Sequence, residues 1–166
     1  MVKKPTGNPP SHSVSVGKKV KDHPLNTTQG TKRLKDFRGA WLLLYFYPKD
    51  ATSGCTQEGL DFSALAGAFK RLNTTLLGVS PDSVSSHQKF KQAHGFAFEL
   101  VADEDKSLCQ HFGVWVKKSL YGRQYMGVER SSFLIDANGT LVMEWRKVKV
   151  AGHAQAVLTA VKAHQQ

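Results

Sequence analysis

The loop between Tyr47 and Glu58, with the sequence YPKDATSGCTQE, holds the side chains best suited to chemistry. It follows an apolar run and precedes a stretch with helical spacing, so we expect it to join the carboxyl end of a strand to a helix. Ligands and catalytic groups of open α/β sheets collect at such strand ends. Unpaired N–H groups and the helix dipole favour an anion in the first helical turn, and a thiolate is an anion. The sequence therefore indicates Cys55 as a candidate nucleophile.

The residues around Cys55 have ordinary structural roles as well as chemical ones. Most free cysteines are small buried hydrophobes, Thr52 could cap the helix, and Pro48 could simply stop the strand. Thr52 lies three residues before Cys55, however, which is close enough in a tight loop for its hydroxyl to reach the sulfur. The spacing Pro-x-x-x-Thr-x-x-Cys at a strand-to-helix junction favours a catalytic role over these structural ones.

The other cysteine of the chain is Cys109, and no CxxC pair occurs. Without such a pair, and without histidines at ligand spacing, the sequence indicates neither a zinc site nor the motif of thiol–disulfide exchange proteins. None of the seven histidines pairs with another ligand at metal spacing, so we expect surface or structural roles for them and no metal site. They are His12, His23, His87, His94, His111, His153 and His164.

The net charge of +10 is compatible with a nucleic-acid partner. The basic residues are scattered in small clusters and form no stripe interleaved with aromatic residues, so we expect a solvated basic surface and no specific nucleic-acid binding. The longest apolar run has seven residues, whereas a membrane-spanning helix needs about 20, so we expect no membrane insertion. The first thirty residues hold no apolar block, and two cysteines suit a reducing compartment, so we expect a cytoplasmic protein.

The length of 166 residues fits one domain. We expect residues 1–13, which are polar with three prolines, to form a flexible arm, and residues 14–166 to form a single domain. Apolar spacing and turn residues predict short strands or a hairpin over 14–33, a helical turn over 34–37, a strand over 41–47, a helix over 56–72, a strand over 75–80, a helix over 83–94, a strand over 98–101, a short helix through 112, an extended loop or ribbon over 114–129, a hairpin over 131–145 with an Asn-Gly turn, and a helix over 154–164. This order predicts an α/β fold with a mixed central sheet, flanking helices and an N-terminal hairpin. The thioredoxin-like arrangement has this order, and other small α/β folds share it.

The pattern formed by Pro48, Thr52 and Cys55 resembles the active-site pattern of the peroxiredoxins, Pro-x-x-x-Thr/Ser-x-x-Cys. The wider segment YFYPKDATSGCTQE is similar to that of the Q-type peroxiredoxins, also called bacterioferritin comigratory proteins, which usually read YFYPKDxTPGCT. Further similar segments are DFRGAWLLLYFYPKD, GVSPDSVSSHQKF, HGFAFELVADED, FGVW, YGRQYMGVERSSFLID and WRKVKVAGHA. They cover roughly residues 15–163, so the resemblance implies a thioredoxin-like fold and a thiol peroxidase over nearly the whole chain.

The resemblance also implies roles for individual residues. Members of the family need an arginine near the cysteine, and the segment GVERSSFLID offers Arg130 for that role. The Cys55 thiolate would attack the terminal peroxide oxygen and become a sulfenic acid. Thr52, Arg130 and backbone N–H groups near Gly54 would bind and orient the peroxide, while Pro48 would shield the thiolate from water. No metal, haem or flavin would be required.

The chain departs from this family where the sulfenic acid must be reduced. Many members carry a resolving cysteine five residues after the first, where this chain has Leu60, and others carry it on the next helix, where an ungapped alignment gives Lys91. Both positions lack a thiol, so we expect a one-cysteine enzyme. Ser53 also replaces the usual proline of TPGC. The alternative is that Cys109 resolves, which would require rearranged helices or a second chain, because a disulfide needs Cα atoms within about 7 Å.

The partners that this resemblance implies are a peroxide and a thiol reductant, either thioredoxin or glutathione with or without a glutaredoxin. We expect a monomer, with a weak dimer as the alternative. A thiol–disulfide exchanger would share the redox chemistry but would use a CxxC pair, which is absent here. The remaining alternative is a non-enzymatic binding or chaperone module on the same fold, and the intact Pro48, Thr52, Cys55 and Arg130 argue against it.

Overall fold

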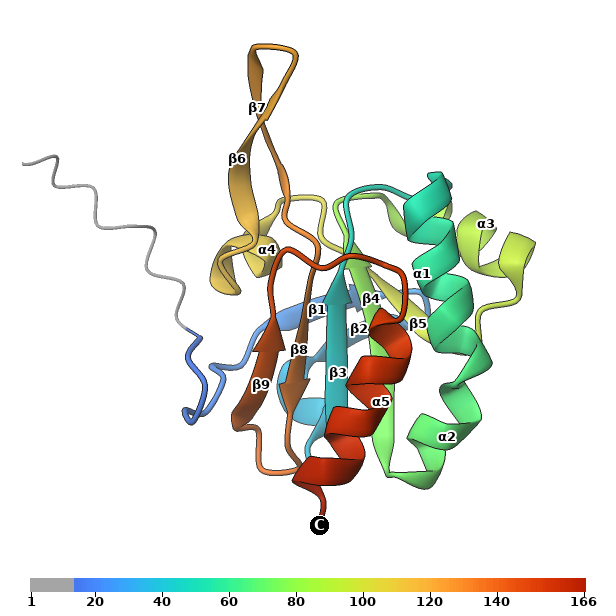
Figure 1. Ribbon diagram of the computed structural model, residues 1–166, viewed down its shortest axis with the longest axis vertical. Helices are drawn as coiled ribbons and strands as arrows, with labels where there is room; N and C mark the ends of the chain where they lie inside the picture. The colour runs from blue at the N-terminus through green and yellow to red at the C-terminus, as the bar shows by residue number, and fades with distance from the viewer. Residues whose placement is uncertain (1–13) are drawn as a thin grey trace, which may run out of the picture.

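The central feature of the fold is one mixed sheet. The computed structural model describes residues 14–166, so the arm expected over residues 1–13 lies outside the described residues. Within residues 14–166, seven strands form the sheet in the order β2-β1-β5-β4-β3-β8-β9 (Figure 1). The strands are β1 (Pro24–Thr27), β2 (Gly30–Arg33), β3 (Trp41–Phe46), β4 (Thr74–Ser80), β5 (Glu99–Ala102), β8 (Ser131–Ile135) and β9 (Leu141–Trp145).

Parallel and antiparallel pairings divide this sheet. β3, β4 and β5 run parallel, as strands joined through helices do. β8 and β9 continue the sheet antiparallel beyond β3, and the hairpin of β1 and β2 lies beyond β5. The predicted α/β fold with a mixed central sheet and an N-terminal hairpin is confirmed.

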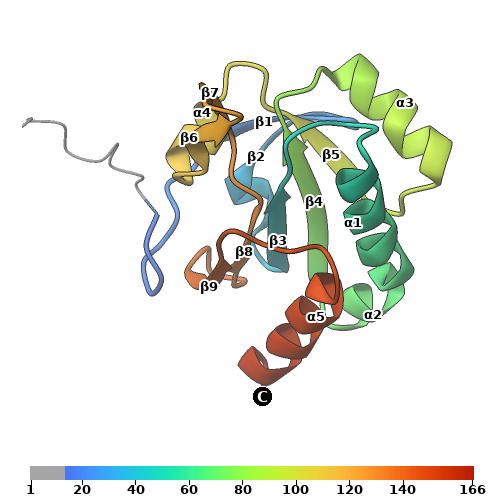
Figure 2. The ribbon, with the colours of Figure 1, turned by 45° about the horizontal axis from the view of Figure 1, so that its top comes forward.

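Helices cover both faces of the sheet (Figures 1 and 2). One face carries α1 (Ser53–Ala64), α2 (Ala66–Arg71), α3 (Val84–His94) and α5 (His153–His164), whereas the other carries the short α4 (Ser107–His111) and the 3-10 turn η1 (Leu34–Phe37). Alternate residues of β3 point to opposite faces. Leu42 and Leu44 pack with the apolar cluster on the α4 face, and Leu43 and Tyr45 pack with the aromatic cluster on the α1 face. Burial on both faces explains why this strand is continuously apolar.

The single helix expected over residues 56–72 is wrong. α1 begins at Ser53, and Leu65 interrupts the helix with φ −99° and ψ 3° before α2 begins. The Leu65 N–H bonds to the Phe62 carbonyl at 3.1 Å, which closes a turn tighter than an α-helical one. Leu65 and Ala68 still pack against the same apolar cluster, so the spacing of apolar residues runs across the break and conceals it.

The predicted boundaries of the second helix and of the last hairpin are confirmed. Ser83 caps α3 by accepting a hydrogen bond from the Ser86 N–H at 3.1 Å, and Gly95 ends the helix in the left-handed region with φ 64°. The Asn-Gly turn joins β8 to β9, and the Asp136 N–H bonds to the Thr140 carbonyl at 2.8 Å across it.

A two-stranded ribbon stands out from the body of the molecule (Figure 1). It consists of β6 (Trp115–Leu120) and β7 (Arg123–Val128), which pair only with each other within residues 14–166. Tyr121 and Gly122 form its turn with φ values of 49° and 75°. The ribbon predicted over residues 114–129 is therefore present, and its second strand leads within two residues to Arg130. In the described part of the chain, no helix is both long and apolar enough to cross a membrane.

Candidate active site

Cys55 is the third residue of α1, and 2% of its surface is exposed. The loop before it leaves the carboxyl end of β3, and Thr52 is the N-cap residue with an extended backbone. Ala51 adopts the left-handed region with φ 60°, an uncommon conformation for a residue that has a side chain. This sharp turn places Cys55 among the first N–H groups of α1, which have no partner within the helix.

Arg130 lies against Cys55, although 75 residues separate the two in the sequence. Its Nη2 donates to Cys55 Sγ at 3.3 Å, and its Nη1 donates to Glu58 Oε1 at 2.6 Å. The Val148 N–H bonds to the Arg130 carbonyl at 2.9 Å and holds the backbone as well. Two bonds from one planar group fix the orientation of the guanidinium beside the sulfur.

Glu58 is a third member of this group, and its importance was not apparent from the sequence pattern. It lies one helical turn beyond Cys55, its side chain is 2% exposed, and its Oε2 has no partner among residues 14–166. Burial raises the pKa of Glu58 to about 7, against the lowering effect of Arg130. Burial lowers the pKa of Arg130, but Glu58 and Cys55 outweigh burial and raise it above the ordinary value. Arg130 therefore stays charged beside the sulfur, while Glu58 titrates near neutral pH.

The other predicted site residues surround this group. Within residues 14–166, the Thr52 hydroxyl donates to the Lys49 carbonyl at 2.8 Å and not to Cys55, so the expected contact with the sulfur is absent in this conformation. Gly54 lies beside Arg130, because a Cβ added there would be 3.5 Å from Nη2. Pro48 is half-buried two residues after the end of β3.

A buried polar network holds the loop against α3. Asp50 accepts hydrogen bonds from the Tyr47 hydroxyl at 2.7 Å and from the Ser86 hydroxyl at 2.8 Å. His87 Nδ1 lies 2.8 Å from Asp50 Oδ2, and His87 Nε2 lies 2.9 Å from the Val101 carbonyl. A carbonyl oxygen only accepts, so Nε2 carries a proton. The buried imidazole thus bridges the Asp50 carboxyl group and the Val101 carbonyl.

This network corrects the expectation that no histidine groups with other metal ligands. Asp50, Asp82 and His87 place one ligand atom each within 4.8 Å of one another. Asp82 Oδ2, however, already accepts hydrogen bonds from the Asp50 N–H at 2.9 Å and from the Ser80 hydroxyl at 2.5 Å. Burial raises the pKa of Asp50, but hydrogen bonds from His87 and Tyr47 hold it below its ordinary value. Hydrogen bonds satisfy the facing atoms of the group, which therefore serves to position the loop.

Cys109 lies on the other face of the sheet. Cys55 packs in the cluster that contains Tyr45, whereas Cys109 is fully buried in the cluster that contains Leu44. The Cys109 N–H donates to Asp103 Oδ2 at 2.7 Å. Burial and then Asp103 raise the pKa of the Cys109 thiol well above its ordinary range. The structure therefore does not bring the two cysteines together.

The two positions at which relatives usually carry a resolving cysteine have side chains without a thiol. Leu60 lies on α1 and is 38% exposed. Lys91 lies on α3, and its Nζ pairs with Glu99 Oε1 at 2.6 Å. Neither side chain can form a disulfide.

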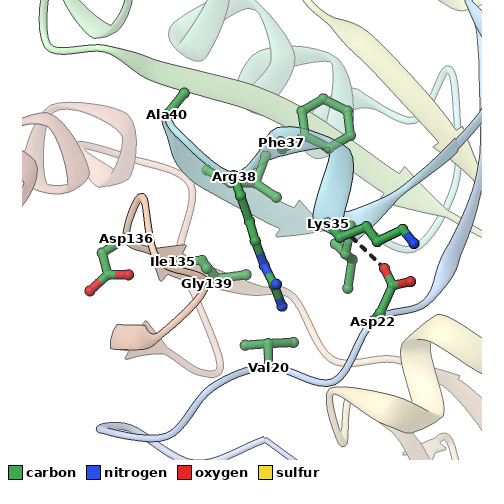
Figure 3. Close-up of a pocket in the computed structure, with 11 residues that line it drawn as sticks. Val20, Asp22, Lys35, Phe37, Arg38, Ala40, Ile135, Asp136 and Gly139 are labelled. Atoms are coloured by element: carbon green, nitrogen blue, oxygen red, sulfur yellow. Dashed lines mark hydrogen bonds between the residues drawn. The ribbon is translucent and has the colours of Figure 1, made fainter.

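The pocket in Figure 3 lies at the opposite end of the sheet from Cys55, between Ala40 before β3 and the turn at 136–139. Arg38 extends into it, and a Cβ added to Gly139 would lie 3.0 Å from Arg38 Nε. Its volume of about 20 Å³ has room for about one water molecule, so it does not compete with the Cys55 region as a substrate site.

The Cys55 group can activate a thiol. A charged guanidinium and the N–H groups of a helix start both stabilise an anion at the sulfur, and the same donors can stabilise charge on an oxygen bound beside it. A thioredoxin-like sheet with such a cysteine at a strand-to-helix junction defines a thiol-based redox protein.

Comparison with known proteins narrows this class. Residues 16–143 match the AhpC/TSA family. Peroxiredoxin Bcp of Xanthomonas campestris pv. campestris is 54% identical over 144 residues, which cover 86% of this chain and 90% of that protein. Peroxiredoxin Bcp of Bacillus subtilis is 44% identical, with coverage of 90% and 96%. A solved structure of Xanthomonas campestris peroxiredoxin Q superposes with a TM-score of 0.83 at 52% identity and covers 87% of this chain and 92% of its own.

The chain therefore belongs to the AhpC/TSA family, and within it to the peroxiredoxins of the Bcp or Q type. It is a thiol-dependent peroxidase, and the family resemblance drawn from the sequence is confirmed.

Proposed function

We propose that Cys55 is the nucleophile of this peroxidase and that Thr52, Gly54, Arg130 and Pro48 form its peroxide site. The observation that carries the proposal is the 3.3 Å contact between Arg130 Nη2 and Cys55 Sγ. Arginine stays protonated at any working pH, so Arg130 favours the Cys55 thiolate throughout that range. The dipole at the start of α1 acts in the same direction.

In the proposed reaction, the Cys55 thiolate attacks the terminal oxygen of the peroxide, and the O–O bond breaks. The sulfur keeps that oxygen as a sulfenic acid, and the departing oxygen takes up a proton and leaves as water or an alcohol. Arg130 and the N–H groups near Gly54 stabilise the charge on the departing oxygen. The hydrogen of the Thr52 hydroxyl is bonded to a carbonyl, so its oxygen is available to accept the peroxide O–H. Pro48 shields the sulfur from water.

We propose further that no cysteine of this chain resolves the sulfenic acid. Cys109 is separated from Cys55 by the sheet, and Leu60 and Lys91 have no thiol. Two solved variants of Xanthomonas campestris peroxiredoxin Q replace cysteines that are 36 positions apart by serine. An ungapped count of 36 residues on from Cys55 leads to Lys91, which is one of the two positions at which the family resemblance places a resolving cysteine.

An external thiol then has to reduce the enzyme. The candidates are thioredoxin and glutathione, the latter with or without a glutaredoxin. Hydrogen peroxide and organic hydroperoxides are the proposed substrates, and a solved structure of the Xanthomonas campestris bacterioferritin comigratory protein is described as giving insight into its alkyl peroxide reduction activity. We place this peroxidase, as a monomer, in the cytoplasm, where its two free cysteines stay reduced.

Peroxide consumption with dithiothreitol as the reductant tests this proposal. Wild type and Cys109→Ser should consume hydrogen peroxide at similar rates, because Cys109 takes no part in turnover. Cys55→Ser should show no turnover above the rate of dithiothreitol alone. Activity that survives in Cys55→Ser would contradict the choice of nucleophile, and activity lost in Cys109→Ser would make the protein a two-cysteine enzyme.

A further inference from the structure

The ribbon of β6 and β7 exposes apolar side chains for which the proposed reaction has no use. Six large hydrophobic side chains are exposed within residues 14–166, and four of them lie on this ribbon. They are Leu120 at 56%, Tyr121 at 96%, Tyr125 at 47% and Met126 at 50% exposure. Exposed apolar side chains gathered in one place mark a contact surface.

The charge of the ribbon is uniform. Residues 115–128 contain Lys117, Lys118 and Arg123 and no acidic residue. A surface that combines basic and apolar side chains selects an acidic partner, because opposite charges attract at the encounter and like charges repel.

The strand register sorts the ribbon residues onto two faces. Cross-strand partners share a face and successive residues alternate. Lys118 pairs with Tyr125 and Leu120 pairs with Arg123, so these four residues share one face. Lys117 pairs with Met126 on the opposite face.

The face with Lys118 and Tyr125 is the one directed at the active site. A Cβ added to Gly127 would lie 3.2 Å from Lys118 Cδ and 3.4 Å from Tyr125 Cε2, so both side chains lie over this glycine at the base of the ribbon. Burial lowers the pKa of Lys118, Arg130 lowers it further, and Glu129 and Cys55 act in the opposite sense.

The opposite face of the ribbon, which holds Lys117 and Met126, lies on the α4 side of the sheet. Its base residue Val128 is buried in the α4-side cluster, and Trp115 packs against the same cluster. The two faces of the ribbon thus continue the two faces of the sheet, and Cys55 and Cys109 lie on the corresponding sides.

We propose that the ribbon face formed by Lys118, Leu120, Arg123 and Tyr125 is the docking surface for an acidic protein dithiol that reduces the Cys55 sulfenic acid. This inference rests on the proposed function, in which an external thiol reduces the enzyme. A strand of six residues spans roughly 20 Å, so a small thiol that reaches Cys55 contacts only the base of the ribbon and leaves its outer part uncovered. A protein surface can cover both.

The chemistry also requires a partner that stays in place. The first thiolate of the partner attacks the Cys55 sulfur, a mixed disulfide forms, and the sulfenic oxygen leaves as water after taking up protons. The second thiolate of the same partner then attacks the partner's first sulfur, which is bonded to Cys55 in the mixed disulfide. The two partner sulfurs form an internal disulfide, and Cys55 leaves as a thiolate. A docking surface keeps the partner aligned through both steps.

The test compares two double variants on neighbouring residues. Arg123→Gln with Tyr125→Ser alters the active-site face, and Lys117→Gln with Met126→Ser alters the opposite face with the same loss of one charge and one large apolar group. Thioredoxin, recycled by its reductase and NADPH, serves as the protein dithiol, and dithiothreitol serves as the small one. The readouts are KM and kcat for each reductant at saturating hydrogen peroxide.

We expect the active-site-face variant to raise KM for thioredoxin by about tenfold or more, because arginine and tyrosine are typical interface hot spots. Its kcat at saturating thioredoxin, and its turnover with dithiothreitol, should remain those of wild type, and the opposite-face variant should match wild type throughout. Equal effects of the two variants, a change in KM for an alkyl hydroperoxide alone, a change only in self-association by light scattering, or wild-type turnover with dithiothreitol but none with thioredoxin would each overturn the docking proposal. Failure of wild type with both reductants would instead refute the proposed function.

Discussion

Cys55 and Cys109 both lie near the start of a helix, and both are almost completely buried. Their surroundings differ in the sign of the neighbouring charge. Cys55 has the Arg130 guanidinium 3.3 Å from its sulfur, whereas burial and then the neighbouring Asp103 carboxylate raise the pKa of the Cys109 thiol. Both cysteines share the position near a helix start, so we infer that the charge brought in from elsewhere in the fold makes the difference between them.

The fold produces this difference by placing the two cysteines on opposite faces of one sheet. On the α1 face, the chain after β7 brings Arg130 to Cys55, and Glu58 holds it there. On the α4 face, the N–H groups of Leu108 and Cys109 at the start of α4 donate hydrogen bonds to the Asp103 carboxylate. The start of α4 is thus capped by a carboxylate, whereas the sulfur at the start of α1 accepts its hydrogen bond from a guanidinium.

Of the changes proposed here, removal of Arg130 should have the largest effect on the reactivity of Cys55. Arg130→Met deprives Cys55 of the neighbouring cation, and we expect the rate of its oxidation by hydrogen peroxide to fall by about a hundredfold or more, as when a transition-state donor is lost. Stopped-flow measurement of the oxidation rate checks this.

Arg146→Met provides the matched control for that measurement. Arg146 is another partly buried arginine, but it donates to the carbonyls of Phe112 and Gly113. Its replacement should cost stability and leave the oxidation rate near that of wild type. A near-native rate in Arg130→Met would show that Arg130 does not activate Cys55.

The pH dependence of stability sharpens the role of Glu58. Its folded pKa of about 7 exceeds the ordinary 4.5, so the folded state holds the proton more tightly and loses this advantage as pH rises from 4.5 through 7. The loss amounts to about 3 kcal/mol at most, from the 1.36 kcal/mol that one pKa unit represents. Glu58→Gln should remove this decline. Urea unfolding of both proteins between pH 5 and pH 8 measures it, and parallel curves would contradict a buried titrating carboxylate.

His153 provides an internal check because it acts with the opposite sign. Burial, and then Arg130, lower its pKa to about 4 from 6.5, so its contribution to stability is lost as pH falls through that range. Once Glu58→Gln removes the decline toward neutral pH, the remaining dependence should be a loss of stability on the acid side, and His153→Asn should reduce that loss.

Replacement of Cys109 should have the smallest effect. Cys109→Ala removes one buried sulfur from a packed cluster, and we expect a loss of about 1–2 kcal/mol in the free energy of unfolding. Peroxide turnover should not change. A large loss of turnover with unchanged stability would mean that the two regions cooperate in the reaction.

Much of the fold was predictable because local signals agree with the global arrangement. The apolar run at residues 41–47 contains β3, a strand buried on both faces, and the helix that follows Ser83 ends before Gly95, where capping rules place its ends. The break at Leu65 was not predictable, because the apolar spacing continues through it.

Site residues that belong to a sequence motif were predictable, whereas residues that only the tertiary structure brings together were not. The segments YFYPKDATSGCTQE and GVERSSFLID indicated Cys55 and Arg130 as site residues, and the structure brings the two into contact. Glu58 lies in the same loop-and-helix segment, but its importance depends on burial and on a partner 72 residues away. The pairing of Asp50 with His87 likewise joins residues 37 positions apart, and no local pattern records it.

The most direct test of the account is the mass of the oxidised protein after one equivalent of hydrogen peroxide. We expect wild type and Cys109→Ala both to gain one oxygen atom. This oxygen should map to Cys55 as a sulfenic acid that dimedone traps, and a protein dithiol should remove it. Loss of two hydrogens in wild type, with Cys55 joined to Cys109 within or between chains, would contradict the claim that Cys55 acts without a resolving cysteine in its own chain.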